Sequence, residues 1–141
     1  MLEANCRYWL MKSEPESYSI DDLKRDNNTS WDGVRNYQAR NFMRDQMKAG
    51  DLVLFYHSSA EPPGLAGIAK VCREAYADKK DPVWVMVDIE FVEKFPRFVS
   101  LEDLRKEPRL KTMLVLKRGQ RLSIQPVEKG HFAIVRNMGR V

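Results

Sequence analysis

The segment from Asp51 to Phe95 reads DLVLFYHSSAEPPGLAGIAKVCREAYADKKDPVWVMVDIEFVEKF, and three strand patterns follow one another along it. Asp51 to His57 is dense in aliphatic and aromatic side chains, which is typical of a buried strand. Ala66 to Tyr76 alternates apolar and polar residues, and Val83 to Phe95 does so more clearly. Because turn-length connections separate the three runs, the segment predicts an antiparallel meander.

Shorter elements flank this meander. Tyr8 to Lys12 is an apolar run that ends just before Pro15, while Met113 to Leu116 and Leu122 to Val127 are two further short apolar runs. We expect each to be a strand, which makes about six strands in all. Asn27 to Ser30 is polar and is expected to be a loop.

Capping boxes predict the starts of two helices. Ser19-Ile20-Asp21-Asp22 precedes a helix over about Ile20–Asp26, and Ser100-Leu101-Glu102-Asp103 repeats the pattern later in the chain. His131 to Met138 is ambiguous, but the three-residue spacing of its apolar side chains favours a helix.

Asn36 is a good cap for another helix, over about Tyr37–Lys48, which ends at Gly50. Its apolar residues at helical spacing are expected to face the core: Ala39, Phe42, Met43 and Met47. Its basic residues are spaced four apart and form either a solvated face or a set of phosphate contacts: Arg40, Arg44 and Lys48. Together these elements predict an α+β fold, a small and mostly antiparallel β-barrel of about six strands with helices packed around it.

The composition is that of an ordinary globular protein, and the 141 residues fit one domain, residues 1–141. No apolar run approaches the roughly 20 residues of a membrane span, so no membrane partner is expected. Met1 to Arg7 does not resemble a secretory signal, which favours a cytoplasmic protein. Cys6 and Cys72 lack metal-ligand spacing and are expected to be free thiols, with no metal and no cofactor bound.

Positive charge is concentrated in the last third of the chain. The whole chain carries +4, whereas residues 104–141 hold 10 Lys or Arg against Glu107 and Glu128, a local +8. This asymmetry indicates either a basic face that follows a phosphate backbone or an ordinary solvated surface.

Several aromatic residues lie beside polar segments: Trp9, Trp31, Tyr37 and Tyr56. Such rings either pack at the rim of a core or stack on a planar heterocycle. Lys12-Ser13-Glu14 is the best candidate for catalysis, because an amine, a hydroxyl and a carboxylate come together there. His57 and Ser58 point to opposite faces of a strand and are a poor catalytic pair, so His57 is expected to be a hydrogen-bonded ring at a pocket wall.

Five blocks, in order and spread over nearly the whole chain, make the sequence closely resemble the EVE domain family: Tyr8–Pro15, Trp31–Phe42, Phe55–Ser58, Gly64–Gly67 and Arg121–Pro126. The resemblance implies a PUA-like fold, related to the YTH readers of methylated adenine. It also implies binding of DNA or RNA that carries modified bases, such as modified cytosines including 5-methylcytosine. The eukaryotic members' N-terminal extension is missing here, which favours a bacterial, cytoplasmic protein.

Carried over by position, the resemblance implies a base-binding pocket made of Lys12, Ser13, Glu14, Trp31, Gly33, Val34, Arg35, Asn36, Tyr56, His57, Ser58, Ser123, Gln125 and Pro126. Arg35, Arg40 and Arg44 are expected to contact phosphates. A base inside a duplex hides its pairing edge, so a reader must extrude it or meet it single-stranded.

Three functions remain open on these grounds. The first is a non-catalytic reader of a modified base, with an aromatic floor and polar groups around the base edge. The second is an amidohydrolase that acts on an acylated nucleoside through Lys12, Ser13 and Glu14, as some PUA-like relatives suggest. The third is a structural RNA-binding accessory without a base pocket.

Overall fold

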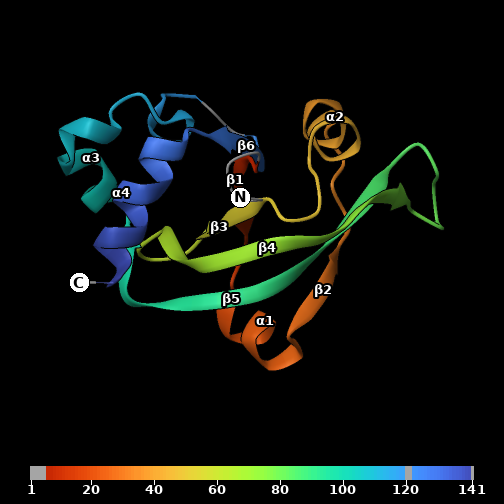
Figure 1. Ribbon diagram of the computed structural model, residues 1–141, viewed down its shortest axis with the longest axis horizontal. Coiled ribbons are helices and arrows are strands. Elements are labelled where there is room, and N and C mark those ends of the chain that lie inside the picture. The colour runs from red at the N-terminus through yellow and green to blue at the C-terminus, as the bar shows by residue number, and fades with distance from the viewer. Residues whose placement is uncertain (1–5, 120–121, 141) are drawn as a thin grey trace.

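The computed structural model of the protein describes residues 6–119 and 122–140, and its centre is a six-stranded sheet in the order β2-β5-β4-β3-β1-β6 (Figure 1). The strands are β1 (Tyr8–Ser13), β2 (Asn28–Trp31), β3 (Leu52–His57), β4 (Gly64–Ala77), β5 (Val85–Ser100) and β6 (Ile124–Val127). The meander β3-β4-β5 is antiparallel as predicted. β1 and β3 are parallel, which is possible because α1, β2 and α2 connect them.

In the part of the chain that the structure describes, four α-helices complete the fold: α1 (Ile20–Asp26), α2 (Tyr37–Asp45), α3 (Leu101–Lys106) and α4 (Lys129–Arg140). Both predicted capping boxes form, since the Ser19 and Ser100 side chains accept the amide protons of Asp22 and Asp103. α2 begins at its predicted Asn36 cap but ends at Asp45, three residues before the predicted Lys48. The fourth helix confirms the interpretation of the ambiguous C-terminal segment.

Strand β3 shows why the sheet is stable, because both of its faces are buried. Val53 and Phe55 pack in one apolar cluster with residues of α1 and α2, including Leu23. Leu54 and Tyr56 pack in a second cluster on the opposite face with residues of α3 and α4. A strand covered on both faces needs apolar residues throughout, which explains the unbroken run LVLFY.

The structure corrects three of the sequence predictions. The sheet is open rather than a closed barrel: β2 and β6 are its edges, and no ladder joins them within residues 6–119 and 122–140. Asn27 to Ser30 is not a loop but contributes to β2, which pairs with β5 as an edge strand and therefore needs no apolar run. Met113 to Leu116 is not a strand but contains a 3₁₀ helix, Leu114–Leu116. A short apolar run alone does not distinguish a strand from a short helix.

The remaining sequence predictions concern the cysteines, membrane-spanning helices and the N-terminal segment. Cys6 and Cys72 are free thiols. In the described part of the chain, no helix has the length and apolar character needed to cross a membrane. Most of the segment used to judge a secretory signal, residues 1–5, and Arg121 lie outside the described residues.

Candidate functional site

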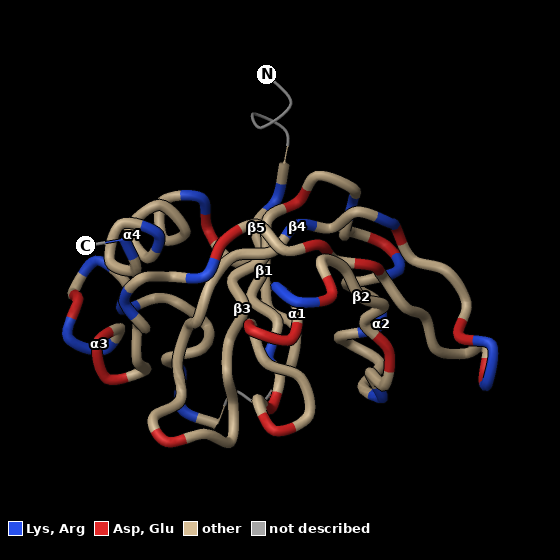
Figure 2. The backbone as a smooth tube through the Cα atoms, turned by 90° about the horizontal axis from the view of Figure 1, so that it is seen from below, with Lys and Arg blue, Asp and Glu red and all other residues tan. Residues whose placement is uncertain are grey.

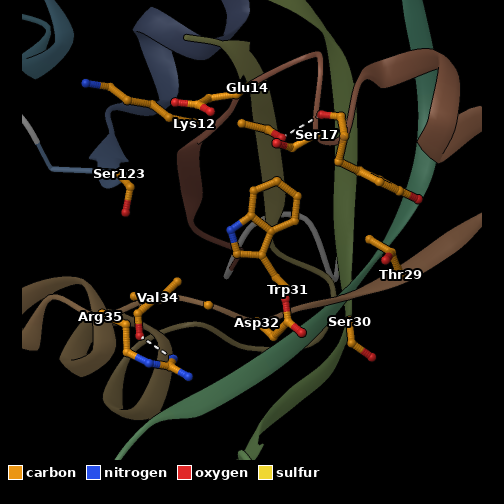
Figure 3. Close-up of a pocket in the computed structure, with 13 residues that line it drawn as sticks. Lys12, Glu14, Ser17, Thr29, Ser30, Trp31, Asp32, Val34, Arg35 and Ser123 are labelled. Atoms are coloured by element: carbon orange, nitrogen blue, oxygen red, sulfur yellow. Dashed lines mark hydrogen bonds between the residues drawn. The ribbon is translucent and has the colours of Figure 1, made fainter. Parts of the chain in front are cut away.

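A cavity of about 480 Å³ lies between the end of β1 and the end of β2 (Figure 3). Its size is within the range of about 300–1,000 Å³ that is typical of small-molecule sites. We call it the Trp31 cavity. It is lined by Lys12, Ser13, Glu14, Ser17, Tyr18, Thr29, Ser30, Trp31, Asp32, Gly33, Val34, Arg35 and Ser123.

Hydrogen bonds hold the wall that follows β1. The Ser13 hydroxyl donates to the carbonyl of Tyr18 at 2.6 Å, as the dashed line in Figure 3 shows. The amides of Ser17 and Tyr18 both donate to the carbonyl of Glu14, at 2.9 and 2.8 Å. β1 ends at Ser13, so strand alternation does not apply to Glu14, which lines the same cavity as Lys12 and Ser13.

The indole of Trp31 forms the aromatic surface of the cavity. Figure 3 shows it extending from β2 into the space between the β1 end and the loop that follows β2. It meets the ring of Phe55 edge to face, with the centroids 5.7 Å apart and the planes at 86°. Phe55 is fully buried, so Trp31 rests on a fixed part of the core while it stays partly accessible to a ligand.

The connection from β2 to α2 forms the opposite wall. Gly33 has φ +78°, a left-handed conformation that favours glycine, and it turns the chain toward α2. The Arg35 guanidinium donates to the Val34 carbonyl at 3.0 Å and to Asp78 Oδ2 at 3.3 Å. The backbone amide of Lys80 and then Arg35 hold the pKa of Asp78 below its ordinary value, so this carboxylate stays charged and anchors Arg35.

Among the described residues, the charges around the cavity balance. Lys12 and Arg35 are matched by Glu14 and Asp32, and the other polar groups are hydroxyls, backbone groups and the indole N–H. Such a lining suits a planar, uncharged heterocycle with a polar edge better than an anion. Within residues 6–119 and 122–140, no group of three or more His, Cys, Asp or Glu is placed to hold a metal ion.

The structure brings together eight of the fourteen residues predicted for the pocket: Lys12, Ser13, Glu14, Trp31, Gly33, Val34, Arg35 and Ser123. It also adds five that the sequence did not indicate: Ser17, Tyr18, Thr29, Ser30 and Asp32. Three of these, Thr29, Ser30 and Asp32, could have been found from the sequence, because they are short polar residues next to Trp31.

Three other predicted residues are engaged in holding the fold. Asn36 Oδ1 accepts the amide proton of Ala39 at 2.9 Å and caps α2. His57 Nε2 accepts the amide proton of Ile20 at 3.1 Å, so the ring is hydrogen-bonded as expected, but it lines none of the four described hollows. Burial lowers the pKa of His57, so the ring can remain a neutral acceptor. The Ser58 amide donates to the carbonyl of Ser13.

The last three predicted residues lie in other hollows. Gln125, whose side chain donates to the Leu122 carbonyl at 3.0 Å, and Pro126 line a separate hollow of about 410 Å³. Tyr56 is 4% exposed and lines a third hollow, which shares Lys12 with the Trp31 cavity.

Two of the arginines predicted to contact phosphates already have partners on α2. Arg44 pairs with Asp45 at 2.8 Å. Arg40 lies over the ring of Tyr37, 4.9 Å from its centroid, and donates to the Val83 carbonyl at 3.0 Å. Neither lines the Trp31 cavity.

Comparisons with known proteins give a consistent result. A family model described as EVE domain matches residues 7–138. Human thymocyte nuclear protein 1 is 43% identical, in an alignment that covers 91% of this chain and 72% of that protein.

Solved structures agree in fold. A hypothetical protein from Leishmania major has a TM-score of 0.89 at 40% identity, with 96% of each chain covered. Human thymocyte nuclear protein 1, in complex with DNA that contains 5-methylcytosine, has a TM-score of 0.84 at 40% identity, covering 96% of this chain and 98% of that one. A YTH domain from Zygosaccharomyces rouxii, at 14% identity and a TM-score of 0.59 over 97% of this chain and 88% of that one, shares the fold.

Proposed function

Because the chain belongs to the EVE domain family, we propose that it binds nucleic acid carrying a modified base, without catalysis, and that the base enters the Trp31 cavity. A modified cytosine is the preferred base, since the human relative was solved with DNA that contains 5-methylcytosine. The observation that carries this proposal is an indole in a charge-balanced cavity of about 480 Å³.

The chemistry of the cavity fits each part of such a base. Stacking on one aromatic ring is worth about 1–3 kcal/mol per base, which offsets part of the few kcal/mol needed to extrude the base from a duplex. Hydroxyls such as Ser17 and Ser123, and the Glu14 carboxylate, can meet the polar edge. The buried Val34 side chain, 7% exposed, offers an apolar contact for a methyl group.

The test is a comparison of matched oligonucleotides. Fluorescence anisotropy would measure affinity for single-stranded and duplex DNA and RNA with either cytosine or 5-methylcytosine at one position, at constant salt. One buried methyl group is worth about 0.8 kcal/mol, so we expect about fourfold tighter binding of the methylated strand. Equal affinities for every matched pair would contradict base reading and favour the RNA-binding accessory without a base pocket.

The amidohydrolase remains the second candidate, because Lys12, Ser13 and Glu14 do line one cavity. The Ser13 hydroxyl, however, donates its proton to the Tyr18 carbonyl, which is not a catalytic base. Incubation with N4-acetylcytidine, followed by chromatography, tests this alternative. Turnover that is lost in Lys12→Ala would replace the reader proposal.

The relatives come from organisms as different as Leishmania major and Homo sapiens, so a bacterial origin and a cytoplasmic location stay predictions.

A further inference from the structure

The hollow that Tyr56 lines has a volume of about 550 Å³, lies next to the Trp31 cavity and shares Lys12 with it. Its polar side chains come from four places in the chain: Lys12, Tyr56, Arg105, Lys117 and Arg118. We call it the Arg105 groove. Figure 3 shows the Lys12 side chain extending away from the Trp31 indole, so this amine lies at the boundary of the two spaces.

The Arg105 groove differs from the rest of the surface in its charge. Figure 2 shows Lys and Arg interleaved with Asp and Glu over most of the backbone. The described lining of the groove, by contrast, has four cationic side chains and no acidic residue. In the described part of the chain, Arg105, Lys117 and Arg118 take part in no ion pair, and their side chains are exposed to solvent. A concave set of cations without carboxylates attracts an anion.

Tyr56 supplies a neutral donor at the base of the groove. Burial raises the pKa of its phenol, so the hydroxyl keeps its proton near neutral pH. The Lys12 amine lies 5.9 Å from the centroid of the Tyr56 ring, and the charge of Arg105 also acts on this phenol. A hydroxyl donor beside several cations matches the oxygens of a phosphodiester.

We propose that the Arg105 groove binds the phosphate backbone of the strand whose modified base occupies the Trp31 cavity. This inference rests on the proposed function, because it places the strand on the side of the cavity where Lys12 connects the two spaces. Arg105, Lys117 and Arg118 would hold successive parts of the backbone, while the discriminating contacts stay at Trp31.

The test uses two variants with the same loss of charge. Arg105→Gln/Lys117→Gln removes two cations from the groove. The control variant, Lys24→Gln/Lys79→Gln, removes two exposed lysines, one on α1 and one in the β4–β5 hairpin, which lies at the opposite end of the molecule from α3 (Figure 1). Neither lysine lines the Trp31 cavity or the Arg105 groove. All four residues are exposed, and a urea unfolding curve for each variant verifies that the fold is kept. Affinities for the single-stranded cytosine and 5-methylcytosine oligonucleotides are measured between 50 and 200 mM salt.

Each phosphate contact contributes about 0.7 to the salt slope of single-strand binding, so the groove variant should lower this slope by about 1.4. Both oligonucleotides should lose affinity by the same factor, which keeps the methylated-to-unmethylated ratio, and the control variant should retain the wild-type slope. An unchanged slope in the groove variant, or an equal fall in both variants, would overturn the proposal.

Two further outcomes separate this inference from the proposed function. If the wild-type protein binds both oligonucleotides equally, base reading fails, and a lower slope in the groove variant alone still supports the backbone site. If no oligonucleotide binds, both proposals fail. Displacement of the strand from the wild-type protein by inorganic phosphate, but not by chloride at equal ionic strength, would support a phosphate site, provided that the groove variant does not show it.

Discussion

The Trp31 cavity and the Arg105 groove are neighbours of similar volume, about 480 and 550 Å³, yet their linings have opposite characters. The cavity has an aromatic ring, hydroxyls and equal numbers of acidic and basic side chains. The groove has four cations and a phenol. The difference suggests that the tasks of choosing a base and holding a strand are divided between the two spaces, with Lys12 between them. Phosphate contacts position a nucleic acid and base contacts specify it, so variants in each space should have separable effects.

The largest effect is expected for Trp31→Ala, because this substitution removes the stacking surface of the cavity. A loss of about 1–3 kcal/mol corresponds to about 5- to 150-fold weaker binding of the 5-methylcytosine oligonucleotide. The salt slope should stay at the wild-type value, since no cation is removed. Anisotropy titrations at several salt concentrations measure both quantities.

Tyr37→Ala is the matched control for this prediction. Tyr37 lies outside both spaces, is 60% exposed and stacks on Trp84, with ring centroids 4.9 Å apart. Its loss should change the affinity much less than Trp31→Ala, while Trp31→Phe should retain part of the binding. If Tyr37→Ala weakens binding as much as Trp31→Ala, the base does not sit at Trp31.

The sequence predicted most reliably those features that depend on contacts between residues close together in the chain. Both capping boxes and the start of α2 depend on residues three positions apart, and the structure has each of them. The openness of the sheet could not be predicted this way, because it depends on whether β2 and β6, almost 100 residues apart, meet. β2 was missed because an edge strand with exposed Asn28 and Ser30 lacks an apolar pattern.

The residues of the cavity and the groove could also be predicted only in part from the sequence. Lys12, Ser13, Glu14 and Trp31 were singled out by their chemistry, the resemblance to a family assigned them to one pocket, and the fold brings them together around one cavity. The groove was visible only as a surplus of charge in residues 104–141. Choosing Arg105 from that surplus required the tertiary structure, since a sequence shows which residues are basic but not which of them lack a partner.

A fall in pH is expected to lower the stability of the fold, an effect of intermediate size. It tests whether the cavity and the groove are lost together when the protein unfolds. Burial lowers the pKa of His57, while Asp21 raises it and Lys94 lowers it further. The unfolded chain therefore takes up a proton near pH 6.5 that the folded protein does not. Stability should be complete above about pH 6.5 and should decrease as the pH falls toward the lowered pKa of His57.

Urea unfolding at pH 7.5 and pH 5.5 measures this dependence. His57→Gln should unfold with a smaller difference between the two pH values than the wild-type protein. At urea concentrations near the midpoint, binding of methylated and unmethylated strands should decline together, because His57 lines neither space. A pH dependence that His57→Gln leaves unchanged would assign the effect to another group.

The smallest effect is expected for Arg40→Gln/Arg44→Gln, although the sequence favoured both residues as phosphate contacts. Arg44 would have to leave Asp45, and Arg40 would have to leave Tyr37 and the Val83 carbonyl, before either could hold a phosphate. Affinity should therefore change less than about twofold, and the salt slope should remain close to the wild-type value. A fall of about 1.4 in this slope, matching that expected for Arg105→Gln/Lys117→Gln, would instead mean that the strand runs over α2 and that existing ion pairs do not prevent phosphate binding.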